Sequence, residues 1–466
     1  MTPSAVPRLA RERRLTLFAL MSLAYFSTSG GAFGIEPLVG SVGPGWAVAL
    51  ILIAPLLWSL PMTLMVAELA TLMPAEGGYY IWVRETLGPF WAVQEAWWTM
   101  GYSLALLAIF PVLFVSYLAY FIPALDPPSA GSPGGAGPLL RWIVALLLIV
   151  SATAVNLRGS REVGGAAKAA AVFIVGTFIV LIASSSVLGP GLGAGIDIAL
   201  HDAISSSPKG LLLGISIIIL NFSGWDNIST YAGEVDQPRR NYPLAVGGAL
   251  LAVVLGYLLP VLAGLGASTD PAVWSDAAGW PVIAALIGGP WLGSLLAAAA
   301  LVSMWALYSA QLLYVSRLPY VMACDGWLPA PLARVSVTTA VPTVSILLFS
   351  VLTAVFAALS YSSLTVILCL LNVASIMLEL LALIVLRVRR PDAPRSFRVP
   401  GGSWGLTYVC AAPVAVALLI VVTTLREWAS YGGQLLVVAG VVVSGIFLYF
   451  ARRRAATAIA RERGAE

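Results

Sequence analysis

Apolar runs of about twenty residues recur from Leu15 to Phe450, and short segments rich in proline, glycine or charge separate them. A run of that length crosses the hydrocarbon core of a bilayer as an α-helix. The pattern therefore predicts an all-α membrane protein of about twelve transmembrane helices. We place these helices at residues 15–40, 46–72, 90–122, 139–157, 165–187, 210–232, 243–267, 283–316, 341–360, 363–387, 406–425 and 433–451.

The first and sixth predicted helices are interrupted in the middle by residues that helices avoid, at 28–34 and 221–227. Unwound backbone at mid-membrane depth is tolerated only where protein buries it or a wet cavity adjoins it. Close helix packing at glycines explains either interruption taken alone. Two interruptions at matching places favour an inverted repeat, with helices 1–5 running against helices 6–10 and a binding site at the midplane.

The positive charges predict the orientation of the chain. Of the 25 lysines and arginines, all but Arg141, Lys209 and Arg426 fall in segments that twelve helices place on one side. Such charges concentrate in cytoplasmic loops, so we expect both termini in the cytoplasm and the chain in the inner or plasma membrane. The expected segments are a tail at 1–14, a first repeat at 15–187, an outer loop at 188–209, a second repeat at 210–387, a cytoplasmic loop at 388–405, two further helices at 406–451 and a tail at 452–466.

Composition excludes several other classes of protein. The chain is 60% hydrophobic and 10% charged, whereas soluble domains carry about a quarter of their residues as charged side chains. Its net charge of +4 lies in clusters beside apolar runs, which argues for membrane orientation and against a nucleic-acid partner. Three scattered cysteines and the single histidine, His201, give no disulfide framework, metal site or catalytic motif. We therefore expect neither an enzyme nor a bound cofactor.

Five motifs, in order and at matching spacing, resemble those of the amino acid–polyamine–organocation (APC) transporter superfamily, most closely its polyamine-uptake branch known from plants. The motifs lie at 29–36, 67–80, 88–91, 225–238 and 316–329. The resemblance implies a LeuT-like core of ten helices followed by two more, which works as a secondary transporter by alternating access.

Several acidic residues fall in predicted membrane helices, where each costs about 2.5–3.5 kcal/mol on insertion scales and so needs a partner or a use. Glu36 follows the first interruption, where it either receives a substrate ammonium group or caps the outer half-helix. Glu68 and Glu379 lie near the cytoplasmic ends of their helices, so snorkelling or pairing with a loop arginine is the favoured explanation. The resemblance makes Asp226 and Glu234 the substrate and proton-coupling region, although Asp226 also suits a helix N-cap.

The full set of expected site residues combines the interruptions with nearby aromatic residues. The resemblance implies that Trp225 is an aromatic gate or a stacking face, and Tyr102 and Tyr308 lie deep in their helices. The predicted substrate contacts are Thr28, Ser29, Gly30, Gly31, Glu36, Tyr102, Asn221, Ser223, Gly224, Trp225, Asp226 and Tyr308. Asp226 and Glu234 are the predicted proton-coupling residues.

A proton is the favoured coupling ion. Some relatives have a lysine in the fifth helix where others bind sodium, and this chain has Ile174 at that position. Sodium remains an alternative, with hydroxyls such as Ser303 and Ser309 as candidate ligands.

The substrate is expected to be an amino acid, carried by proton symport. The plant branch has acids at positions that Ser27, Pro37 and Leu106 or Leu107 occupy here, and the amides at 29–31 suit a substrate carboxylate. Uptake of polyamines such as putrescine or spermidine is the alternative, followed by an amino acid exchanger and by a channel or receptor. The expected partners are a small-molecule substrate and membrane lipid.

Overall fold

The computed structural model describes residues 17–73, 78–126, 137–202, 208–225, 238–275, 279–336, 339, 341–393, 395 and 397–465. Within these ranges the regular secondary structure is helical, with no β-strand. Nine helices of the described chain are long and apolar enough to cross a membrane. They are Pro44–Leu72, Pro89–Ala119, Pro138–Arg158, Glu162–Leu188, Pro243–Ala267, Pro290–Cys324, Tyr361–Arg389, Gly402–Arg426 and Trp428–Arg454. The prediction of an all-α, multi-pass membrane protein is confirmed at this level.

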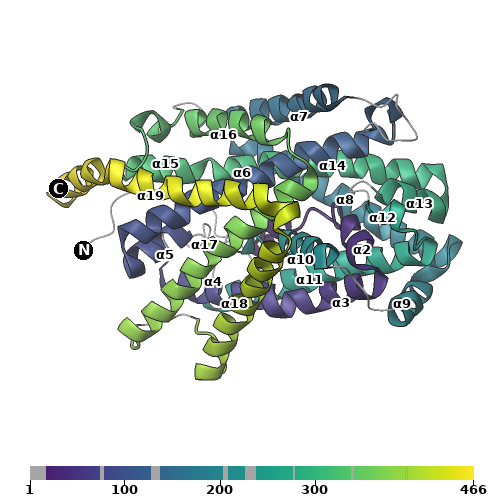
Figure 1. The fold of residues 1–466 in the computed structure, drawn as a ribbon, viewed down its shortest axis with the longest axis horizontal. Helices are drawn as coiled ribbons and strands as arrows, with labels where there is room; N and C mark the ends of the chain where they lie inside the picture. Colours follow the sequence, from purple (N-terminus) through teal and green to yellow (C-terminus); the bar gives the residue numbers. More distant parts are fainter. Residues whose placement is uncertain are drawn as a thin grey trace.

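The α-helices follow one another along the chain as shown in Figure 1. They are α1 (Leu17–Thr28), α2 (Glu36–Val42), α3 (Pro44–Ala54), α4 (Leu60–Leu72), α5 (Gly78–Leu87), α6 (Pro89–Ala119), α7 (Pro138–Arg158), α8 (Ser160–Leu188), α9 (Gly191–His201), α10 (Pro208–Asn221), α11 (Pro238–Ala267), α12 (Pro271–Ser275), α13 (Trp280–Gly288), α14 (Pro290–Val315), α15 (Arg317–Cys324), α16 (Thr343–Phe356), α17 (Tyr361–Arg389), α18 (Gly402–Arg426) and α19 (Trp428–Ala465). A π-helical turn, η1 (Pro55–Ser59), joins α3 to α4.

The first predicted interruption is present, and the helix before the second one ends where the prediction placed the break. Helix α1 ends at Thr28 and α2 begins at Glu36, and between them Gly31 and Gly34 have φ angles of 94° and 81°. Helix α10 ends at Asn221, and Gly224 has a φ angle of 104°. Glycine adopts positive φ without steric strain, so these glycines allow the chain to leave the helix. The structure describes the second interruption only as far as Trp225.

The structure adds detail to three of the predicted ranges. The helix expected at 283–316 is two helices, because Gly289 has a φ angle of 87° and separates α13 from α14, which Pro290 begins. The outer loop expected at 188–209 contains the helix α9, and the last helix extends well beyond 433–451 at both ends.

Helices α6, α14 and α17 form the centre of the bundle, and most of their side chains are buried. Helix α17 packs against α6, and α6 also packs against α14. Helices α18 and α19 lie along one side of the bundle (Figure 1) and bury few side chains. The site described below lies among the central helices, where the two interruptions meet them.

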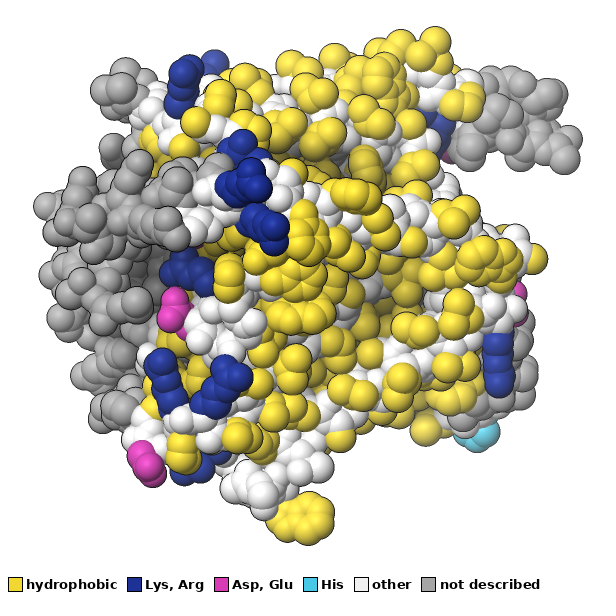
Figure 2. All heavy atoms as spheres, turned by 60° about the vertical axis from the view of Figure 1, so that its left-hand side comes forward, with side chains coloured by type: hydrophobic (Ala, Val, Ile, Leu, Met, Phe, Trp, Pro, Cys, Tyr) yellow, Lys and Arg dark blue, Asp and Glu magenta, His cyan; other side chains and the backbone are white. Residues whose placement is uncertain are grey.

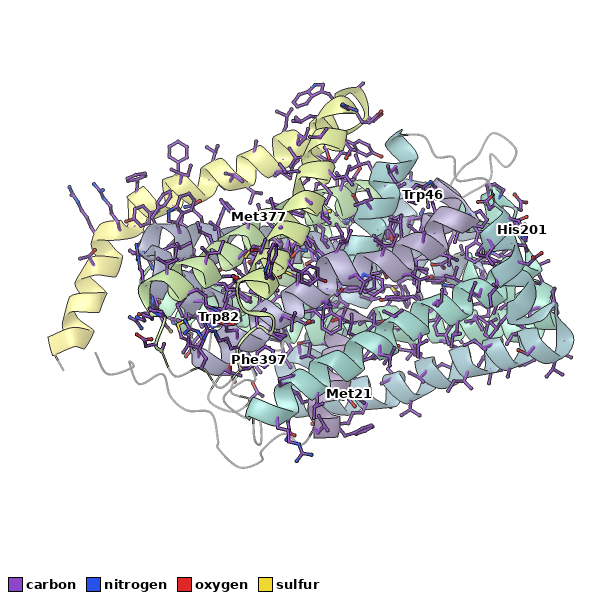
Figure 3. All side chains as sticks on the ribbon, turned by 90° about the horizontal axis from the view of Figure 1, so that it is seen from below. Met21, Trp46, Trp82, His201, Met377 and Phe397 are labelled. Atoms are coloured by element: carbon purple, nitrogen blue, oxygen red, sulfur yellow. The ribbon has the colours of Figure 1, made fainter. Side chains whose placement is uncertain are left out.

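The two ends of the bundle differ in charge. Hydrophobic side chains cover most of the face in Figure 2, and most of the visible lysines and arginines lie toward one end. Trp82 and Phe397 lie near one end of the bundle and Trp46 and His201 near the other (Figure 3). We call the end that carries Arg387, Arg389 and Arg390, at the end of α17, the arginine-rich end.

Candidate functional site

A cavity of about 80 Å³ lies where the two interruptions meet the central helices. The unwound segment after α1 and the end of α10 form part of its wall, and α6, α11, α14 and α17 form the rest. Its polar lining consists of Thr28, Tyr102, Asn221, Ser223, Tyr257, Gln311, Tyr361 and Asn372. The described residues that line it include no Asp, Glu, Lys, Arg or His.

Side chains from distant helices bind the carbonyl groups that unwinding frees beside α1. Ser303 donates its hydroxyl hydrogen to the carbonyl of Gly30 at 2.8 Å, and Tyr361 donates to that of Gly34 at 2.7 Å. The Trp280 indole donates to the carbonyl of Ala32 at 2.5 Å. Backbone groups in a membrane interior need such partners, so this broken segment is held in a defined conformation.

The freed backbone at the end of α10 is bound in the same way. Tyr257 donates to the carbonyl of Asn221 at 3.0 Å, and Trp225 donates to that of Phe222 at 2.8 Å. Ser59 also donates to the Phe222 carbonyl, at 3.1 Å. Residues of η1 and α11 therefore fix the second interruption against the cavity.

The glycines of the first interruption also allow close packing. A Cβ atom at Gly30 would lie 2.2 Å from Cδ1 of Leu307, and one at Gly31 would lie 2.7 Å from Cγ2 of Ile174. Both distances are far inside van der Waals contact. Close helix packing and the cavity, which the sequence offered as alternative explanations, occur here together.

Ser223 on the cavity wall accepts hydrogen bonds from two side chains. Asn372 donates from Nδ2 to Oγ of Ser223 at 2.9 Å, and the Trp58 indole donates to the same oxygen at 3.2 Å. Asn221 donates from Nδ2 to the carbonyl of Ile217 at 2.8 Å. An amide that donates through its nitrogen keeps its carbonyl oxygen as an acceptor, so Asn221 and Asn372 can accept from an ammonium group.

The structure brings most of the predicted site residues together. Thr28, Gly30, Gly31, Tyr102, Asn221, Ser223 and Gly224 line the cavity. Ser29, Glu36 and Tyr308 are buried but are not among the lining residues. Asp226 and Glu234 lie outside the residues that the structure describes.

Glu36 is fully buried at the first residue of α2. Its Oε1 accepts from the Tyr117 hydroxyl at 2.6 Å and from the backbone amide of Trp280 at 3.4 Å. Tyr117 also accepts from the amide of Gly34 at 3.2 Å. These contacts connect the Glu36 carboxylate to the unwound segment through Tyr117.

Tyr308 lies on α14 away from the cavity. Its side chain is fully buried, and its neighbours are Thr153 on α7 together with Ser350 and Thr353 on α16. The structure therefore places Tyr308 in the packing between these helices.

Sequence reasoning missed Gln311 on α14, Asn372 on α17 and Tyr257 on α11, which all line the cavity. An amide side chain within a long apolar run was the available signal for Gln311 and Asn372, because polar groups are costly in a membrane helix. Tyrosine is common in membrane helices, so the sequence held no comparable signal for Tyr257.

A second, smaller cavity of about 10 Å³ adjoins the first. Ser223 and Gly224 line both cavities. The other lining residues of the second cavity are Trp58, Met62, Met65, Val66, Trp225, Ile376 and Glu379. Glu379 is buried there, so snorkelling to the surface is not its role.

Glu68 forms a buried ion-pair cluster near the arginine-rich end. Its carboxylate accepts from Nε and Nη2 of Arg387 at 2.6 and 2.5 Å, and Nε of Arg395 lies 3.1 Å away. The backbone amide of Val399 donates to it at 2.8 Å. The expected pairing of Glu68 with an arginine is confirmed, and it joins α4 to the end of α17 and the segment beyond it.

A second polar cluster joins α5 to the residue after α15. Arg84 donates to Asp325 at 3.0 Å, and the Tyr80 hydroxyl donates to the same carboxylate oxygen at 2.9 Å. Burial and then the Asp325 carboxylate raise the pKa of the Tyr80 phenol above its ordinary value. Tyr80 therefore stays protonated and remains a donor.

Comparison with known proteins gives one family match and several relatives. The model of a family described as amino acid permease matches residues 14–460. The chain is 34% identical over 450 residues to a protein of Arabidopsis thaliana named a probable polyamine transporter, covering 94% of this chain and 86% of that protein. It is 34% identical to a polyamine transporter of Oryza sativa subsp. japonica, covering 90% of this chain and 76% of the relative. A methylthioribose transporter of Bacillus subtilis is 26% identical, with 83% of this chain and 84% of the relative covered.

Proposed function

The chain belongs to the amino acid permease family of the APC superfamily, a family of transporters rather than enzymes, and from this premise we propose that it is a secondary active transporter of polyamines. The observation that carries the proposal is the similarity over nearly the whole chain to plant proteins named polyamine transporters. These names support polyamine transport. The residues Ser27 and Pro37, at positions where the plant branch has acids, had favoured an amino acid substrate instead.

The central cavity is compatible with a cationic amine. Carbonyl oxygens of Asn221 and Asn372 can accept from an ammonium group. The rings of Tyr102, Tyr257 and Tyr361 also line the cavity, and aromatic faces attract cations by about 0.5–2 kcal/mol. A neutral but polar cavity can thus receive one ammonium group of an amine.

The proposal includes twelve transmembrane helices in a LeuT-like arrangement. The nine long apolar helices, together with the shorter α10 and α16 and the interrupted α1, supply that number. Residues 15–187 and 210–387 would form the inverted repeats, with 406–451 as the two additional helices. Both termini and the arginine-rich end would then face the cytoplasm.

Transport would proceed by alternating access to the central cavity. The cluster of Glu68, Arg387 and Arg395 ties α4 to the end of α17 at the arginine-rich end, so it would have to open for cytoplasmic release. We assign proton coupling to Asp226 and Glu234, outside the described residues. Sodium is the alternative ion, for which the Ser303 hydroxyl and the Gly30 carbonyl, 2.8 Å apart, are the kinds of ligand required.

Amino acid transport is the second candidate function. The described residues that line the central cavity are uncharged, which favours this candidate. The family that matches the chain is also described as amino acid permease. An amino acid presents a single ammonium group beside a carboxylate, which the amides of the unwound segment could bind.

Competition for binding to the purified protein distinguishes the two candidates. The proposal expects putrescine and spermidine to displace labelled spermidine at much lower concentrations than any amino acid. Displacement by an amino acid at lower concentration than either polyamine would reverse the assignment.

A further inference from the structure

The second cavity has room for one group about the size of a water molecule. Its volume of about 10 Å³ is close to the minimum that holds a single water. A primary ammonium group is of similar size. Ser223 and Gly224 line both cavities, so the two cavities are neighbours along the end of α10.

The walls of the second cavity suit a cation. Glu379 supplies a carboxylate that is 1% exposed, and Trp58 and Trp225 are equally buried. Both indole N–H groups are used elsewhere, by Ser223 and by the carbonyl of Phe222. Indole rings attract cations, and the sulfurs of Met62 and Met65 complete a soft, polarisable lining.

Helix α17 sets the spacing between the two cavities. Asn372 lines the first cavity and Glu379 the second. Residues seven apart lie two turns along the same helix face, with a rise of about 10 Å. That span suits an extended alkyl diamine or polyamine. The ammonium group of an α-amino acid and its own carboxylate are much closer together.

We propose that Glu379 binds a second ammonium group of a linear di- or polyamine while the first ammonium group occupies the central cavity. The subsite rests on the proposed function, because it assigns the substrate to amines with two separated charges. An ammonium group beside this buried carboxylate would form a charge-assisted hydrogen bond, whereas a monoamine held in the central cavity does not reach Glu379.

The test compares a diamine with a monoamine of the same carbon chain. Glu379→Gln keeps the side-chain shape and removes the charge. Its dissociation constants for putrescine and n-butylamine are measured by displacement of labelled spermidine or by calorimetry on the purified full chain. The subsite predicts that the constant for putrescine rises about tenfold or more, while that for n-butylamine stays within about twofold.

Glu95→Gln is the matched control. Glu95 is fully buried on α6, where its Oε1 accepts from Thr99 at 2.8 Å and Ser375 at 3.0 Å, and it lines neither cavity. The glutamine keeps an oxygen acceptor for these two donors, so the ratio of putrescine to n-butylamine affinity should not change. If Glu95→Gln also loses the preference for putrescine over n-butylamine, the effect is a general one of removing buried charge. That result would overturn the subsite.

A second variant tests the same cavity without changing a charge. Val66→Leu adds one carbon to a wall of the second cavity. It should weaken the binding of putrescine and leave the binding of n-butylamine unchanged. An unchanged preference for putrescine in both Glu379→Gln and Val66→Leu would refute the subsite while leaving polyamine transport intact. An equal loss of affinity for putrescine and for n-butylamine would also refute the subsite, because it would show a structural effect of the substitution. If the wild-type protein binds neither amine, the proposed function fails and the subsite with it.

Discussion

Arg387 at the end of α17 donates to both carboxylate oxygens of Glu68 on α4, at 2.6 and 2.5 Å, and both side chains are almost completely buried. The two residues are 319 positions apart in the chain. Arg395 and the amide of Val399 bind the same carboxylate. One acid therefore holds together α4, the end of α17 and the segment that follows α17, at the arginine-rich end.

Replacing this acid should destabilise the protein. Glu68→Gln leaves Arg387 and Arg395 without their buried counter-charge, and breaking a buried pair costs about 3–5 kcal/mol. Thermal unfolding of the protein in detergent measures the loss. The control is Glu85→Gln, because Glu85 pairs with Arg84 at 3.5 Å and its side chain is half exposed. That change should cost less than about 1 kcal/mol. Equal melting temperatures for the two variants would contradict the structural role of Glu68.

The first interruption should tolerate no side chain at Gly31. Gly31→Ala combines a φ angle of 94° with a Cβ atom 2.7 Å from Ile174. Overpacking of this kind costs about 1–3 kcal/mol, and the distorted cavity wall should also impair uptake. Gly176→Ala on α8 is the control, since its Cβ would meet no atom within 4 Å. Normal stability and uptake in Gly31→Ala would show that the close packing described here is not required.

Asn372 should contribute to substrate affinity rather than to stability alone. Asn372→Ala removes the hydrogen bond to Ser223 and one acceptor of the cavity wall, so the KM for putrescine should rise about fivefold to tenfold. Asn156→Ala is the control. Asn156 is buried on α7, where it donates to Ala152 and Ser309 and does not line the cavity. Its loss should lower the melting temperature without changing KM. A larger change of KM in Asn156→Ala would contradict the assigned site.

The orientation can be tested by labelling single cysteines in a variant that lacks Cys324, Cys369 and Cys410. Arg390 and Arg426 are both exposed, and the proposed map places them on opposite sides of the membrane. A membrane-impermeant thiol reagent applied to intact cells should label Arg426→Cys and not Arg390→Cys. Labelling of Arg390→Cys from outside would overturn the map.

Local sequence signals predicted some features of the fold. The glycines at 30, 31 and 34 and the polar run after Leu220 marked both interruptions, because helices in lipid avoid such residues. The position of Glu68 near the cytoplasmic end of its predicted helix suggested either snorkelling or pairing with an arginine, and the structure shows the pairing. The Gly289-Pro290 step also carried a signal, a helix start at proline, but the long apolar run around it obscured the break.

Contacts between distant segments could not be predicted. Asn372 meets Ser223 across 149 positions, and Tyr117 meets Glu36 across 81, so neither pairing leaves a trace in local periodicity. The contact of Glu36 with the backbone amide of Trp280, 244 positions away, could not be predicted either. The burial of Glu379 beside Trp225 likewise depends on how α17 packs against the end of α10.

Uptake into proteoliposomes that contain only this protein tests the central claim most directly. Labelled spermidine is supplied outside, with the external solution more acidic than the lumen, and uptake is compared with that of a set of labelled amino acids. A polyamine symporter should accumulate spermidine saturably, should lose this accumulation when an ionophore removes the pH gradient, and should show counterflow from vesicles preloaded with putrescine. Accumulation of an amino acid but not of spermidine or putrescine would contradict the central claim.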